Sequence, residues 1–91
     1  MTELYCVVSG KVQNVAYRTY VQDSAGELLI TGWTRNLSDG TVEVLAQGMP
    51  DVLKEFVEYL HEGSLLSLVE SVAIDWRTVK VVYDDFSIKH D

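Results

Sequence analysis

Apolar and polar positions alternate along the chain with two different periods, and each period predicts one kind of element. Residues 4 to 9 form a short run of β-branched, aromatic and small apolar residues that Gly10 ends, which is typical of a strand buried on both faces. From residue 17 to about 28, apolar residues recur every three or four positions, so we expect an amphipathic helix. Residues 32 to 37 alternate with the two-residue period of a strand.

The second half of the chain continues in the same way. Asp39-Gly40 indicates a hairpin turn, and the alternating residues 42 to 48 predict a third strand. A second helix is expected from Pro50, a residue suited to a first helical position, to a glycine cap at Gly63. Residues 72 to 76 predict a fourth strand, and residues 86 to 88 predict a short fifth strand.

The order of these elements, β-α-β-β-α-β, predicts an α+β fold of the ferredoxin-like sandwich type, formed by a single domain of residues 1–91. Both helices are expected on one face of an antiparallel sheet, with the short fifth strand at the carboxyl end. In this topology the first two strands run parallel with the third between them. The loop of residues 10 to 18 and the strand end at Asn36 are therefore expected at the same edge of the sheet.

Charge narrows the range of partners. The 91 residues carry a formal net charge of -7, which disfavours binding to nucleic acid or to anionic lipid. The first 35 residues have no net charge, because three basic residues balance three acidic ones. An anionic ligand would therefore meet least repulsion in the first third of the chain.

Cysteine and histidine positions give no sign of a metal centre or disulfide. Cys6 is the only cysteine, and we expect it to pack as a small buried hydrophobe in a protein of the reducing cytoplasm. His61 and His90 have no partner at metal-ligand spacing, so surface positions are expected for both. The chain shows neither a secretory signal nor an apolar run of the roughly 20 residues that cross a bilayer.

The loop before the first helix has the chemistry of an anion site. Backbone N–H groups at a helix amino terminus lack intrahelical acceptors and, with the helix dipole, favour a negative ligand. Arg18 adds a planar guanidinium that can hold two phosphoryl oxygens at once. The alternative is an ordinary β-α loop with a solvated arginine. Nucleotide-binding glycine loops are excluded, because neither Gly-Lys-Ser/Thr nor the dinucleotide fingerprint is present.

Two motifs resemble the signatures of the acylphosphatase family: Gly10-x-Val12-Gln13-x-Val15-x-Tyr17-Arg18, and Gly32-Trp33-x-x-Asn36-x-x-Asp39-Gly40-x-Val42-Glu43. The resemblance implies a small monomeric cytoplasmic enzyme, without metal or cofactor, that hydrolyses acyl phosphates to carboxylate and inorganic phosphate. It also implies that Arg18 binds the phosphoryl group and Asn36 orients the attacking water. The phosphate-binding loop it implies consists of Lys11, Val12, Gln13, Asn14, Val15, Ala16 and Tyr17.

This chain departs from the family pattern at a few positions. Asn14 and Ala16 stand where glycine is usual, and Lys11 where arginine is common. If Ala16 needs a positive φ, the loop is strained and we expect weaker phosphate binding; otherwise the alanine is harmless. Residues 64 to 68 are more apolar than is usual in the family, as a partner contact or local packing would make them.

Two other functions of the same fold remain as alternatives. One is a non-catalytic anion-binding or docking module, which the altered loop residues would favour. The other is an RNA-binding module, which requires exposed aromatic residues with basic neighbours on the central strands and is opposed by the negative charge.

Overall fold

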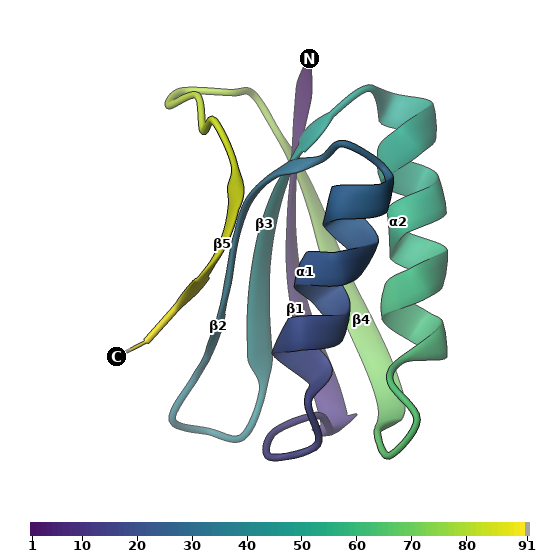
Figure 1. The fold of residues 1–91 in the computed structure, drawn as a ribbon. Helices are drawn as coiled ribbons and strands as arrows, with labels where there is room; N and C mark the ends of the chain where they lie inside the picture. The colour runs from purple at the N-terminus through teal and green to yellow at the C-terminus, as the bar shows by residue number, and fades with distance from the viewer. Residues whose placement is uncertain (91) are drawn as a thin grey trace.

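The computed structural model describes residues 1–90, which form a five-stranded sheet and two helices (Figure 1). The elements are, in chain order, β1 (Thr2–Lys11), α1 (Tyr17–Glu27), β2 (Thr31–Asn36), β3 (Val42–Gly48), α2 (Pro50–Glu62), β4 (Leu68–Arg77) and β5 (Phe86–Lys89). The predicted order of elements is therefore confirmed. Pro50 stands in the first turn of α2, and the amide of Gly63 donates to the Tyr59 carbonyl oxygen at the other end, as expected of a cap.

The strands lie in the order β4-β1-β3-β2-β5, and both helices cover one face of the sheet (Figure 1). β3 lies between β1 and β2, as predicted, because a right-handed β-α-β crossover leaves room for one strand between them. β1 pairs antiparallel with β3 on one side and with β4 on the other, and β2 pairs antiparallel with β3. The sheet is not antiparallel throughout, as had been expected, since β5 runs parallel to β2.

The core lies between the helices and the covered face of the sheet. Leu4, Cys6 and Val8 point into it from β1 and are fully buried. The prediction that this strand is buried on both faces is wrong, because Tyr5 and Val7 on the other face are only half-buried. The reason is that the helices pack on one face alone, so a central strand is fully covered on that side only.

β4 lies at one edge of the sheet and is longer and more exposed than its pattern suggested. It begins at Leu68, four residues before the predicted start. Trp76 lies opposite Leu4 of β1, yet 44% of its surface is exposed. An edge strand has a neighbour on one side only, which leaves such a side chain partly uncovered.

In residues 1–90, neither helix combines the length and the apolar character that a bilayer crossing requires.

Candidate active site

A pocket of about 170 Å³ opens where the β1–α1 loop meets the carboxyl ends of β2 and β5. The predicted proximity of the loop and Asn36 is therefore observed. The pocket is lined by Val12, Asn14, Ala16, Tyr17, Arg18, Thr19, Asn36, Ile88 and His90. None of these lining residues is acidic, so the described part of the pocket wall presents no fixed negative charge to an anion.

The backbone of the loop is bent at Asn14 and Ala16. Their φ angles are 61° and 59°, so two non-glycine residues within three positions adopt the left-handed conformation. Such curvature turns successive backbone amides toward one side, which is how protein loops form concave anion sites. Ala16 therefore has the positive φ that was expected to strain the loop and weaken phosphate binding.

Helix α1 presents its amino terminus to the same pocket. Ala16 is the N-cap residue, and its carbonyl oxygen accepts the first helical hydrogen bond from the amide of Tyr20 at 3.1 Å. The amides of residues 17 to 19 precede that bond and have no acceptor within the helix. With the partial positive charge of the helix terminus, these groups favour an anion in the pocket.

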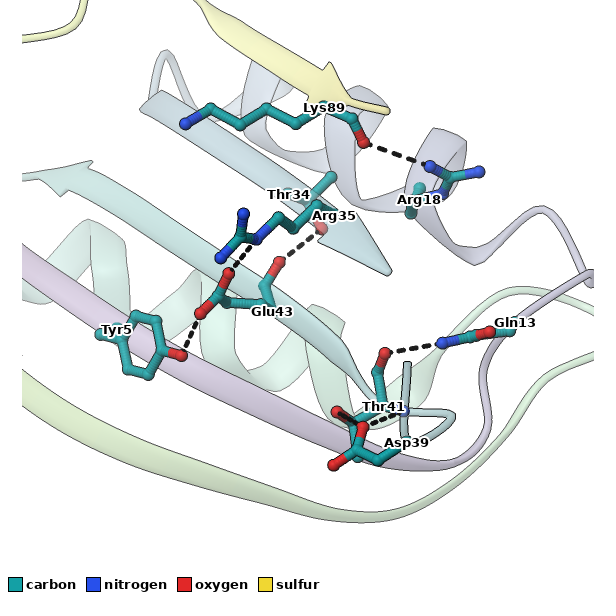
Figure 2. A network of polar contacts seen from close by, with 9 residues as sticks. All are labelled: Tyr5, Gln13, Arg18, Thr34, Arg35, Asp39, Thr41, Glu43 and Lys89. Carbon is teal, nitrogen blue, oxygen red and sulfur yellow. Dashed lines mark hydrogen bonds and ion pairs between the residues drawn. The ribbon is translucent and has the colours of Figure 1, made fainter. Parts of the chain in front are cut away.

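Two side-chain contacts hold the loop between its neighbours. On one side, the Gln13 Nε2 atom donates to the carbonyl oxygens of Leu37 and Thr41, at 2.8 and 2.9 Å, and so fastens the loop to the β2–β3 turn. Figure 2 shows the bond to Thr41. On the other side, the Ser64 hydroxyl donates to the Val15 carbonyl oxygen at 3.0 Å and fastens the loop to the α2–β4 connection. The loop is therefore held in place before any ligand binds.

Arg18 comes from the first turn of α1 and is steadied by β5. Its Nη1 atom donates to the Lys89 carbonyl oxygen at 3.4 Å, as Figure 2 shows. A planar guanidinium has five N–H groups, so this single bond leaves donors for an oxyanion. The parallel pairing of β5 with β2 thus brings Ile88 and His90 to the candidate site.

Arg35 precedes Asn36 in the sequence, but its side chain lies on the opposite face of the sheet. Successive strand residues point to opposite faces. The Arg35 guanidinium binds the Glu43 carboxylate, which also accepts a hydrogen bond from the Tyr5 hydroxyl (Figure 2). Burial and this bond raise the pKa of Tyr5 to about 12, so the hydroxyl keeps its proton. Of the two arginines in the motifs, only Arg18 lines the pocket in the described chain.

Asn36 ends β2 at the pocket and carries an unusual polar atom. Its Oδ1 atom is buried and accepts no hydrogen bond from any group in residues 1–90. A buried acceptor without a donor costs about 1–3 kcal/mol, which structures rarely retain away from functional sites. The Asn36 Oδ1 atom is thus an acceptor that the described chain leaves without a donor.

Tyr17 contributes mainly to the framework of the site. Its side chain is 1% exposed, and its hydroxyl donates to the Leu60 carbonyl oxygen of α2 at 2.7 Å. Burial raises the pKa of Tyr17 well above its ordinary value, so the phenol is neutral. This bond joins the start of α1 to the end of α2 beneath the pocket.

The remaining predicted loop residues are placed differently. Lys11 is exposed at the end of β1 opposite Leu68, and it does not line the pocket. Gln13 and Val15 do not line the pocket either, because each is engaged with a neighbouring segment through the contacts described above.

Thr19, Ile88 and His90 line the pocket and were not predicted as site residues. His90 is exposed, as expected, yet it stands at this pocket because β5 ends there. Ile88 lies in β5, and His90 follows the last residue of that strand. The sequence offers no signal for which loop that strand would reach.

Comparisons with known proteins agree with these observations. The sequence model of the acylphosphatase family matches residues 4–88. A protein named acylphosphatase from Marinobacter nauticus is 43% identical over 86 residues, covering 94% of each chain. The crystal structure of acylphosphatase from Bacillus subtilis superimposes with a TM-score of 0.96 at 34% identity, over 99% of this chain and 100% of that one.

A structure of an acylphosphatase from Coxiella burnetii gives a TM-score of 0.91 at 40% identity, over 97% of this chain and 92% of that one. Sequence and fold are thus shared over nearly the full length of the relatives, and both signature motifs fall within the matched residues. This chain belongs to the acylphosphatase family.

Proposed function

We propose that the pocket performs the reaction of the family, with Arg18 and the loop amides binding the phosphoryl group of an acyl phosphate and Asn36 orienting the attacking water. The chain is an acylphosphatase, which hydrolyses the carboxyl–phosphate bond. The observation that supports these residue roles is the meeting of Arg18, the strained loop and Asn36 around one pocket without an acidic lining residue.

The reaction makes modest demands on the protein. Water adds to phosphorus while the bond from phosphorus to the acyl oxygen breaks, and the carboxylate leaves with the bonding electron pair. One proton of the water stays on the new phosphate oxygen and the other moves to a second phosphate oxygen, giving dihydrogen phosphate. Because a carboxylate departs without being protonated, no general acid is required. Catalysis then rests on positioning and on stabilising charge at the phosphoryl oxygens.

The chain's own groups meet these demands. The Arg18 guanidinium and the amides of residues 12 to 17 neutralise the phosphoryl oxygens as charge spreads over them. Asn36 holds the water through its carboxamide oxygen. That oxygen is buried in this structure, so the proposed role includes a rotation of the amide that turns the oxygen toward the pocket.

Benzoyl phosphate hydrolysis in the presence of a chelator tests the assignment. We expect Arg18→Ala to lower kcat/KM by about 1000-fold or more, in the range found for arginines that stabilise phosphoryl transfer. Arg18→Lys should also be severely impaired, because an ammonium lacks the bidentate geometry. Asn36→Ala should lower kcat by about 100-fold, as loss of one positioned polar group does elsewhere.

Arg77 offers a matched control, since it is an arginine of the edge strand β4 that does not line the pocket. Arg77→Ala is expected to retain wild-type activity. Active Arg18→Ala or Asn36→Ala variants, or hydrolysis that the chelator abolishes, would contradict the proposal. Phosphate binding by calorimetry without turnover would instead favour the non-catalytic anion-binding module.

We also propose that the enzyme is a cytoplasmic monomer that does not bind nucleic acid. The support is the net charge of -7 and the single cysteine, which is buried. Light scattering coupled to size exclusion should report one chain of 10.2 kDa. Retention on a polyanion resin at low salt would contradict the second part.

A further inference from the structure

A second hollow, of about 360 Å³, adjoins the phosphate pocket on the side of the α2–β4 connection. We call it the apolar groove; its walls include Ala16, Thr19, Tyr20, Asp23, Leu65 and Leu66. Leu65 is 98% exposed and Leu66 is 68% exposed. Two adjacent leucines held in water beside a binding pocket are a feature that core packing does not explain.

The groove borders the phosphate pocket. Ala16 and Thr19 line both hollows, so one wall is shared. The hydrogen bond from Ser64 to the Val15 carbonyl oxygen fixes the leucine-bearing connection against the phosphate loop. Figure 1 shows the β1–α1 loop and the α2–β4 connection at the same end of the molecule.

The direction of the groove also suits the chemistry. The β2–β3 turn, which follows Asn36, is fastened to one side of the phosphate loop by Gln13. The groove lies beyond the other side, toward the connection that Ser64 holds. In phosphoryl transfer the attacking and leaving oxygens stand roughly in line on opposite sides of phosphorus. Water placed by Asn36 therefore implies a leaving acyl group directed toward the groove.

We infer that the apolar groove is the subsite for the acyl group, and that the enzyme favours acyl phosphates with uncharged, apolar chains of several carbons. This inference rests on the proposed function. The acyl carbon is one oxygen away from phosphorus, so any longer chain must leave the phosphate pocket and lie against an adjoining surface. Leu65, Leu66 and the ring of Tyr20 provide that surface.

The charge of Asp23 affects which acyl groups the groove can accept. Its exposed carboxylate lines the groove on α1. A negative group at the far end of an acyl chain would be placed near it and repelled. The groove therefore selects against acyl phosphates of dicarboxylic acids.

The test compares kcat/KM for acetyl, butanoyl and hexanoyl phosphate. Full burial of one methylene corresponds to about a fourfold change, so half-burial in an open groove gives about twofold. We expect hexanoyl phosphate to be preferred over acetyl phosphate by about 15-fold in the wild type, for four added methylenes. In the double variant Leu65→Ser/Leu66→Ser, this ratio should fall to about 3-fold.

Leu29→Ser is the matched control, because Leu29 is 89% exposed, follows the far end of α1 and does not line the groove. It should keep the wild-type ratio. Succinyl phosphate should be a poorer substrate than butanoyl phosphate, and Asp23→Asn should narrow that difference.

The outcomes separate the inference from the proposed function. Turnover of acetyl phosphate without any chain-length preference, or a preference that survives the double leucine substitution, overturns the inference alone. A double variant that changes sedimentation but not the ratio also overturns it, since the leucines then form a contact between two copies of the chain. Absence of turnover with every acyl phosphate overturns the proposed function and the inference together.

Discussion

Replacing Ala16 by glycine should stabilise this protein, although glycine in place of alanine usually destabilises a folded chain. Ala16 has φ 59° and ψ 25°, in the left-handed region. The left-handed conformation is about 1–2 kcal/mol less favourable for an L-residue with a β-carbon, and glycine has no such penalty. The alanine methyl group is exposed, so its removal leaves no cavity.

The gain is reduced by the greater freedom of glycine in the unfolded chain, which is about 0.4–1 kcal/mol. The net increase in the free energy of unfolding is therefore about 0.8 kcal/mol. For a domain of this size, that corresponds to a rise in Tm of about 3–6 °C. Any part of the backbone strain at Ala16 that develops only when the ligand binds weakens ligand binding. Phosphate should therefore bind somewhat more tightly to Ala16→Gly, by no more than about fivefold.

Thermal and urea denaturation followed by circular dichroism measure the first effect, and product inhibition by phosphate measures the second. Ala73→Gly is the control, because Ala73 is an exposed residue of β4 within a regular strand. The same chemical change there should lower the free energy of unfolding by about 0.5–1 kcal/mol. If both glycine variants are destabilised to the same extent, Ala16 carries no strain and the reasoning is refuted.

Two further predictions concern buried groups. Tyr17→Phe removes the buried hydrogen bond to the Leu60 carbonyl oxygen and should lower the free energy of unfolding by about 1–2 kcal/mol. Tyr20→Phe, which loses a bond to Tyr59 at a half-buried site, should cost less in the same urea titration, and an equal or larger loss would contradict this ranking. Desolvation raises the pKa of the Cys6 thiol to about 12, whereas the unfolded chain ionises it near 8.5. The contribution of this thiol to the free energy of unfolding is fully present below about pH 8.5. It is then lost as pH rises toward 12, by up to ~1.4 kcal/mol per pH unit. Urea titrations at pH 8, 9 and 10 should show a shallower decline for Cys6→Ala, and parallel declines would contradict the assignment.

Local pattern was sufficient for most of the fold. An apolar run for β1 and the periods of apolar residues for the other elements placed both helices and all five strands, since such patterns reflect geometry within a few residues. Pro50 and Gly63 marked the ends of α2 because their backbone preferences are intrinsic. The strand order followed from the handedness of the β-α-β crossover. The proximity of the loop to Asn36 was a consequence of that order.

The sequence by itself thus determined the elements, their order, the family motifs and the proximity of the β1–α1 loop to Asn36. Only the tertiary structure decided that Ala16 is left-handed, because alanine has no intrinsic preference for that conformation. It also decided that β5 runs parallel to β2 and brings His90 to the pocket, and that Leu65 and Leu66 border a groove. These features depend on contacts between segments 40 to 70 residues apart, and no local period encodes which distant surfaces meet.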